Sequence, residues 1–342
     1  MILRAKAPLR LSFCGGGTDV LPYLAEHGGC VLSTTIDHYA YASLRTHQAP
    51  TITVKSLDYD VIIKHDMIDQ PLPYDGNLDL VKAVLNRLHL PEIVGHEDGI
   101  DIFLHSDAPP GSGLGSSSTL VVALIGLLKE RHHLALTSYD VADLAYQIER
   151  IDMSLKGGKQ DHYAAAFGGF NYIEFYKDTT IVNPLRIAPD VLNELQYNLL
   201  LCYTGATRMS ANIIEKQVQN VLQQNVDVLS AMSELKQLTL ALKNALLRGK
   251  LDDFGHLLHQ AWLNKKQMAD TISTPHIDEL YEAARQQGAL GGKITGAGGG
   301  GYMFFYCPFE AKHKIARALT QQGAQLVDFE FDAFGLQTWT VR

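Results

Sequence analysis

The chain has 342 residues, of which 46% are hydrophobic and 19% charged, and its formal net charge is −8. This length and composition favour a globular protein with two domains, which we place at residues 1–185 and 186–342. The negative charge and the lack of a basic run argue against nucleic acid as a partner. No apolar run reaches the length of a membrane span, the first residues show no signal-peptide core, and the four cysteines are scattered singly, so we expect a cytoplasmic protein without membrane contact.

A strand and a glycine turn are expected first along the chain. Apolar and polar residues alternate over Leu9–Cys14, which predicts a strand. The strand leads into Gly15–Asp19, where three successive glycines indicate either close approach of the backbone to a ligand or a simple turn capped by Asp19. We expect further strands near residues 30–33, 39–46, 51–54 and 61–63, and an amphipathic helix over residues 78–88.

The central feature of the sequence is the stretch Pro109–Ser118. A half-buried strand is predicted before it at 100–104, and a buried helix after it at 119–128. Glycines let backbone N–H groups approach an anion, the helix dipole favours negative charge, and serines add hydroxyl donors, so the loop is typical of a polyphosphate site. It is not the common P-loop, because no Lys follows the last glycine, and its glycine spacing does not fit a dinucleotide fingerprint. A flexible glycine-serine turn is the alternative.

Two carboxylates stand out after this loop. Residues 137–140 signal a helix start, and the helix that follows places Glu149 at the edge of its apolar face, beside two alanines. Such a carboxylate is either part-buried with room in front of it or a surface residue beside the apolar stripe. Asp161 follows a glycine- and lysine-containing stretch, Lys156–Gln160, and precedes small residues. Flanking lysines should keep a carboxylate ionised and able to accept a proton, and a helix N-cap is the structural alternative.

The second half of the chain is expected to open with another strand-to-helix junction. The strand predicted at 197–203 ends in Thr204–Ser210, which begins a helix and carries Arg208. A helix N-terminus with an arginine suits a phosphate group, and the alternative is a surface arginine. The helical region that follows should break near Asn225 and end by Gly249.

A second glycine-rich run, Gly291–Gly301, leads into a buried strand at 302–306. Because its neighbours are apolar, we expect its backbone to pack against another loop or a ligand rather than to form a linker. The other elements of this half should finish antiparallel, as in an α+β domain. They are helices at 251–269, 277–287 and 311–321 and strands at 326–331 and 336–341.

Three of these stretches together resemble the motifs of the GHMP kinases, the family of galactokinase, homoserine kinase and mevalonate kinase. Ala7–Arg10 with Gly17–Asp19 resembles the first motif, Pro109–Ser118 matches the second, P-P-x-x-G-L-G-S-S, and Lys293–Gly301 matches the third, K-x-T-G-A-G-G-G-G. The matches occur in the family's order and span most of the chain. The resemblance implies an α+β, two-domain fold, with an N-terminal S5-like α/β domain, a C-terminal ferredoxin-like α+β domain, and ATP between them.

The resemblance also implies phosphoryl transfer from ATP to a hydroxyl with the help of Mg²⁺. Asp161 matches the family's catalytic aspartate, and Arg10 matches the basic residue beside it. Ser117 and Glu149 match the residues that contact the magnesium ion. The implied ATP contacts are Pro110, Gly111, Ser112, Gly113, Leu114, Gly115, Ser116, Ser117 and Ser118, and the substrate contacts are Gly17, Thr18, Asp19, Arg208, Gly298 and Gly299.

The acceptor that the resemblance implies is a sugar. Galactokinase has Glu-His where this sequence has Gly16–Gly17, which argues against galactose itself. The form Arg10–Asp19 resembles that of the bacterial D-glycero-D-manno-heptose 7-phosphate kinases, which phosphorylate the anomeric hydroxyl on the route to GDP-heptose. We therefore expect a sugar phosphate as substrate, with Arg208 on its phosphate, and a monomer or homodimer. The alternatives are a kinase for an unphosphorylated sugar of the fucose or galactose type and a sugar and ATP sensor without turnover, against which the intact catalytic residues argue.

Overall fold

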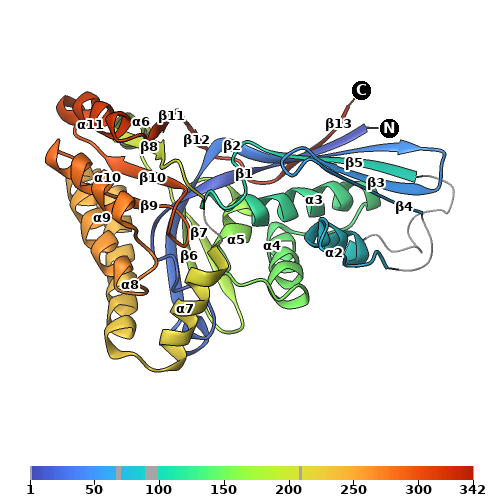
Figure 1. Ribbon diagram of the computed structural model, residues 1–342, viewed down its shortest axis with the longest axis horizontal. Helices are drawn as coiled ribbons and strands as arrows, with labels where there is room; N and C mark the ends of the chain where they lie inside the picture. The colour runs from blue at the N-terminus through green and yellow to red at the C-terminus, as the bar shows by residue number, and fades with distance from the viewer. Residues whose placement is uncertain (1, 67–70, 89–98, 208–209, 342) are drawn as a thin grey trace.

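The computed structural model describes residues 2–66, 71–88, 99–207 and 210–341. Within these ranges the chain forms two β-sheets, each associated with its own group of helices (Figure 1). The mixture of helices with largely antiparallel sheets is the α+β class predicted from the sequence. None of the described helices is both long enough and apolar enough to cross a membrane.

The larger sheet is built around two long antiparallel strands, β1 (Ile2–Cys14) and β2 (Gly29–His47). Its main path among the described residues runs β13 (Gln337–Val341), β1, β2, β5 (Gly99–Ser106), β3 (Thr51–Ser56) and β4 (Val61–Asp66), while β12 (Phe331–Asp332) and β6 (Asn171–Phe175) pair with β2, and β7 (Thr180–Pro184) pairs with β6. Strands β3 and β5 are parallel. The pairing of β1 with β2 shifts register between Pro8 and Arg10, which lets the strand change direction beside the site described below.

One face of the larger sheet is covered by helices (Figure 1). The central one is α3 (Ser116–His132), which contacts the sheet and the helices around it, so that nearly its whole first two-thirds is buried. This burial explains why residues 119–128 are apolar on every side of the helix. The other elements of this half are α1 (Tyr23–His27), α2 (Asp79–Leu88), α4 (Ser138–Tyr146), the π-helical turn η1 (Gln147–Asp152) and α5 (Gln160–Phe167).

The smaller sheet has the order β11 (Gln325–Val327), β8 (Leu199–Tyr203), β10 (Tyr302–Tyr306), β9 (Gly291–Ile294), with every neighbouring pair antiparallel. In chain order this is 4-1-3-2, the ferredoxin-like arrangement that the resemblance implied. The helices of this half are α6 (Pro189–Asn198), α7 (Ser210–Leu222), α8 (Val226–Leu247), α9 (Leu251–Lys266), α10 (Pro275–Gln286) and α11 (Phe309–Gln321). The predicted helix break is confirmed, because Asn225 caps α8 through its side chain.

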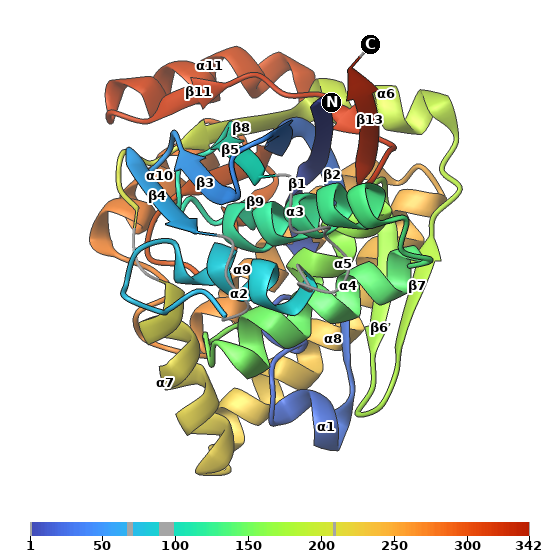
Figure 2. The ribbon, with the colours of Figure 1, turned by 90° about the vertical axis from the view of Figure 1, so that its right-hand side faces the viewer.

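The last strands depart from the sequence-based expectation. The single strand expected at 326–331 is two short strands in different sheets, because the chain leaves β11, crosses to the larger sheet and pairs with β2 as β12. The Gln196 side chain holds this crossing, since it donates to the Phe329 carbonyl and accepts from the Phe331 N–H. Strand β13 then pairs with β1 (Figure 2). The boundary at 185/186 stays a prediction, and the final strands belong to the first sheet.

Strand β1 contributes to both hydrophobic cores. Leu3, Ala5 and Ala7 lie in the core between the larger sheet and its helices. Leu9, Leu11 and Phe13 lie in the core of the second half. The Phe13 ring makes edge contacts with Phe254 of α9 and Phe304 of β10, with ring centroids 5.3 and 5.6 Å apart. The two halves are therefore joined through packed side chains of one strand.

We expect Phe13→Ala to lower the free energy of unfolding by about 3–5 kcal/mol, because it leaves a cavity where the two halves join. The matched control is Phe309→Ala, since that ring is 62% exposed and its loss should change stability by no more than about 0.5 kcal/mol. Chemical denaturation of both variants measures the difference. Equal effects from the two substitutions would show that Phe13 does not join the halves.

Candidate active site

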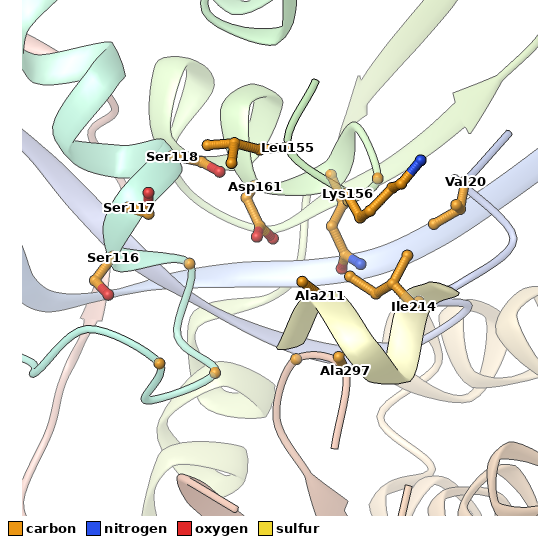
Figure 3. A pocket seen from close by; sticks show the side chains of 18 of the residues that line it. Val20, Ser116, Ser117, Ser118, Leu155, Lys156, Asp161, Ala211, Ile214 and Ala297 are labelled. Atoms are coloured by element: carbon orange, nitrogen blue, oxygen red, sulfur yellow. The ribbon is translucent and has the colours of Figure 1, made fainter. Parts of the chain in front are cut away.

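A cavity of about 580 Å³ lies where the two halves meet. The first half contributes the end of β1, the phosphate loop that precedes α3, and the loop before α5. The second half contributes α7, the end of α9 and the glycine run before β10. Figure 3 shows Asp161 between the serines Ser116–Ser118 on one side and Lys156 and Val20 on the other. The carboxylate therefore lies between the phosphate loop and the remainder of the cavity.

The phosphate loop, Pro109–Gly115, has the backbone shape that its glycines predict. Gly111, Gly113 and Gly115 have φ angles of 76°, 83° and 82°, which L side chains rarely adopt. Gly115 is the N-cap of α3, and the first turn of α3 contains no acidic residue. The loop thus presents free N–H groups and the positive end of a buried helix to the cavity, an arrangement that binds anions.

The third motif packs directly on this loop. The Tyr302 N–H donates to the Ser112 carbonyl, 3.1 Å away, and a Cβ on Gly301 would lie 2.1 Å from that same oxygen. A Cβ on Gly296 would lie 2.8 Å from the Gly113 Cα. The expectation that this glycine run packs against another loop is confirmed. Its glycines are needed because any side chain would separate the two backbones.

Arg10 and Asp161 form an ion pair in the cavity. The Arg10 Nε and Nη2 atoms each lie 2.7 Å from Asp161 Oδ1, and Nη1 donates to the Gly113 carbonyl. Arg10 is 2% exposed, and the Asp161 side chain is 20% exposed. Asp161 lies inside the first turn of α5 and is not its N-cap, which is Lys159. The cation that contacts Asp161 is therefore Arg10 and not one of the lysines that precede it in sequence. Both Arg10 contacts fall on Oδ1, and the Asp161 residue lines the cavity.

Glu149 lies on the π-helical turn η1 and not on a continuous α-helix. It is 2% exposed and accepts hydrogen bonds from Ser117 (3.1 Å), Ser118 (2.6 Å) and the buried His162 ring (2.6 Å). Burial alone would raise the pKa of the Glu149 carboxyl, but the neighbouring Arg150 charge and these hydrogen bonds lower it to about 2. Glu149 is therefore a buried, ionised carboxylate that contacts the first turn of α3, and the alternative that it is a surface residue is excluded.

The oxygen atoms of Glu149 and Ser117 are suitable ligands for a magnesium ion that is also bound to phosphate. Oε2 accepts from Ser118 and His162, whereas the described part of the chain gives Oε1 a single donor, Ser117, so a hard oxygen remains beside a hydroxyl that lines the cavity. Among the described residues no group of three or more metal-ligating side chains comes together. Mg²⁺ commonly binds through one or two protein oxygens, nucleotide phosphates and water, so a single carboxylate with a serine suffices.

The predicted substrate residues fall into three groups. Gly17, Asp19 and Gly298 line the cavity. Thr18 is fully buried, and its hydroxyl bonds to the Gly15 and Cys30 backbone, while the Gly299 N–H donates to the Ile272 carbonyl, so neither of them lines the cavity. In the phosphate loop Ser112 and Leu114 are likewise buried behind the cavity wall. Arg208 lies outside the described residues.

Sequence reasoning missed several polar residues of the site. His162 and Arg150 surround Glu149, and Gln160, Gln217 and Lys265 line the cavity on the side of Asp19. A sequence signal exists for His162, since it follows Asp161 directly. No sequence signal identifies Lys265, because a lysine in the last turn of a helix is ordinarily a solvated residue that complements the helix dipole.

Similarity to known proteins shows the family of this chain. A family model described as GHMP kinases N terminal domain matches residues 79–169, and one described as GHMP kinases C terminal matches residues 242–325. The chain is 36% identical over 340 residues to D-glycero-alpha-D-manno-heptose 7-phosphate kinase of Campylobacter jejuni, covering 99% of both chains. The chain belongs to the GHMP kinases.

Two further relatives of this GHMP kinase have informative names. A crystal structure of a D-glycero-D-manno-heptose 1-phosphate kinase from Bacteroides thetaiotaomicron superimposes with a TM-score of 0.83 at 35% identity, covering 99% of both chains. The bifunctional fucokinase/GDP-fucose pyrophosphorylase of Arabidopsis thaliana is 26% identical over 333 residues, which cover 94% of this chain and 31% of that enzyme. As a GHMP kinase, the protein is an ATP-dependent phosphotransferase.

The close contact between the loops predicts that Gly301→Ala weakens ATP binding more than tenfold, because the new Cβ would collide with the Ser112 carbonyl. Gly323→Ala is the matched control. Its φ of 89° resembles the 95° of Gly301, yet a Cβ there meets nothing within 4 Å. The control should show only the backbone strain, about 1–2 kcal/mol of stability, with unchanged ATP affinity. Calorimetric titration with ATP measures both variants, and equal ATP affinity in the two would refute the contact's role.

Proposed function

We propose that this GHMP kinase transfers the γ-phosphoryl group of ATP to the anomeric hydroxyl of D-glycero-D-manno-heptose 7-phosphate, giving the 1,7-bisphosphate. The observation that carries the chemistry is the Arg10–Asp161 pair, which faces the cavity beside the phosphate loop. The sugar phosphate is supported by the two heptose phosphate kinases that are 35–36% identical over nearly the whole chain. The monomer or homodimer and the cytoplasmic location stay predictions.

In this proposal Asp161 acts on the acceptor hydroxyl. Its free oxygen accepts the hydroxyl proton as the sugar oxygen attacks the γ-phosphorus, the bond from that phosphorus to the β-γ bridging oxygen breaks, and ADP leaves. Arg10 keeps Asp161 oriented through two nitrogen atoms and ties it to the phosphate loop through the Gly113 carbonyl. The N–H groups at the start of α3 offset the negative charge of the phosphates.

We further propose that Glu149 and Ser117 hold the magnesium ion that accompanies ATP. When bound, the ion would neutralise charge on the phosphate oxygens. Neighbouring residues orient this ligand: His162 and Ser118 form hydrogen bonds with the Glu149 carboxylate. The low pKa of Glu149 keeps it ionised over the physiological pH range.

A panel of acceptors tests the proposed reaction. Purified enzyme with ATP and Mg²⁺ should release ADP fastest with heptose 7-phosphate, and more slowly with heptose, heptose 1-phosphate, fucose and galactose. The panel includes the 1-phosphate because the names of the two heptose kinases differ in the phosphate position. A preference for fucose would instead support the second candidate, an unphosphorylated-sugar kinase, which the similarity to fucokinase favours. Binding of ATP without ADP release for any sugar would support a sensor.

Asp161→Asn should reduce kcat about 10²–10⁴-fold, because the amide cannot accept the hydroxyl proton. The dissociation constant for ATP should change little, since the side chain bonds to Arg10 and not to the phosphate loop. Asp152→Asn is the control, because Asp152 is exposed and does not line the cavity. Steady-state kinetics and ATP titration measure both. If Asp161→Asn turns over within a few-fold of the unaltered enzyme, Asp161 is not the base.

Glu149→Gln and Ser117→Ala should each raise the Mg²⁺ concentration needed for half-maximal activity about 10–100-fold, the equivalent of losing one contact to a charged group. The control is Glu130→Gln at the opposite end of α3, where the carboxylate accepts a hydrogen bond from the Thr338 hydroxyl. Magnesium titrations at fixed ATP, together with Mn²⁺ binding followed by electron paramagnetic resonance in the presence of ADP, measure the effect. An unchanged magnesium requirement would rule out the metal role of the altered residue.

A further inference from the structure

Lys265 is a buried cation that faces the cavity. It lies in the last turn of α9, is 4% exposed and lines the cavity on the side of Asp19. A lysine ammonium carries three N–H donors. Within the described residues its hydrogen-bond partner is the Gly16 carbonyl, at 3.3 Å. The ammonium therefore has donors to spare at a place where water is largely excluded.

The other buried lysines of the described chain show how such a charge is usually satisfied. Lys82 pairs with Asp75 and Asp79, with nitrogen-to-oxygen distances of 2.6 and 3.6 Å. Lys293 donates to the Ser12 carbonyl at 2.7 Å and lies over the Phe304 ring, outside the cavity wall. A buried charge without enough partners is unfavourable, so the remaining donors of Lys265 indicate a ligand that the protein binds there.

The glycines of the first motif leave room beside Lys265 for side chains of the second half. Gly17 has a φ of 108°, and a Cβ on it would lie 2.5 Å from the Met268 side chain and 2.8 Å from the Gln217 amide nitrogen. Gln217 of α7 donates to the Gly17 carbonyl at 2.9 Å, as Lys265 does to Gly16. Gln217 of α7 and Met268, which follows α9, thus occupy the volume that a side chain at position 17 would fill, whereas Gln160 of α5 lies nearest to one at position 16. Gln217 and Lys265 supply polar groups from the second half.

We propose that Lys265 binds a hydroxyl of the acceptor sugar next to the one that reacts. This inference rests on the proposed function. Lys265 lines the same cavity as Asp19 and Asp161, so a sugar held there by Asp161 through its reacting hydroxyl also comes within the space that Lys265 faces. Two carboxylates would repel a phosphate at this point, whereas a sugar hydroxyl can accept from Lys265 and donate to Asp19 at once. Lys265 therefore selects an acceptor by its hydroxyl pattern and leaves the acceptor's own phosphate to another part of the cavity.

Lys265→Met tests this assignment, with Lys266→Met as the matched control on the same helix. Lys266 points away and pairs with Asp278 at 3.2 Å. The KM for the sugar acceptor should rise about 10–100-fold in Lys265→Met, which corresponds to one lost charged hydrogen bond. Its dissociation constant for ATP, measured by titration without acceptor, should stay within about twofold of the unaltered enzyme, and Lys266→Met should match the unaltered enzyme in both.

Two results would overturn the proposal. An acceptor KM within twofold of the unaltered enzyme would show that Lys265 does not touch the sugar. Equal losses for acceptor and ATP with a lower melting temperature would show that Lys265 only anchors the Gly16 carbonyl. Both differ from failure of the proposed function, in which the unaltered enzyme itself phosphorylates no sugar.

A measurement on the unaltered enzyme keeps the test decisive if Lys265→Met does not fold. Burial lowers the pKa of Lys265 to about 8, although Asp19 opposes the shift. The charged and titratable groups that face it are Arg10 and Cys14 of β1, Asp19, Asp161 of α5 and Lys293 of β9. Because the ammonium loses its proton above about pH 8, kcat/KM for the acceptor should fall through that pH, while the ATP dissociation constant stays level. An acceptor profile that stays level to pH 9.5 would overturn the proposal.

Discussion

The backbone of the phosphate loop lies in direct contact with the backbone of the third motif, Lys293–Gly301, and the arrangement of the site follows from that contact. The Gly301 Cα hydrogen occupies a place where a Cβ would lie 2.1 Å from the Ser112 carbonyl, so only glycine fits there. Because the run leads into β10 and the loop leads into α3, the contact fixes the core of each half relative to the other. Residues of both segments line the cavity, so their contact also sets the width of its wall.

Strand β1 extends this arrangement through the molecule. Its odd-numbered apolar residues pack first into one core and then into the other, and Arg10, between Leu9 and Leu11, forms the ion pair with Asp161. The Arg10 N–H also donates to the Leu114 carbonyl, 3.1 Å away, so the strand that carries the arginine is tied to the phosphate loop by its backbone. The proposed base, its arginine and the anion site are thus positioned by rigid elements and not by long loops, which suits a reaction that depends mainly on positioning.

Features that depend on backbone geometry were predictable from the sequence, because glycine and serine at fixed spacing leave few alternatives. The phosphate loop, the glycine contact and the helix break near Asn225 belong to this group. Features set by packing between distant segments were not. The π-helical turn that carries Glu149 arises where α4 meets α3 and α5, the burial of Lys265 depends on β1 lying against α9, and β12 separates from β11 because β2 offers it a partner.

The pairing of β13 with β1 has a consequence for synthesis on the ribosome. Strand β1 is synthesised long before β13, the partner for its outer edge, because Ile2 lies opposite Val341. The whole ferredoxin-like unit must be translated in between, while that edge of β1 presents unpaired N–H and C=O groups to any strand nearby. The smaller sheet can close as soon as β11 is complete, whereas β12 and β13 join the larger sheet only afterwards, so the half that contains the proposed base is completed after the other.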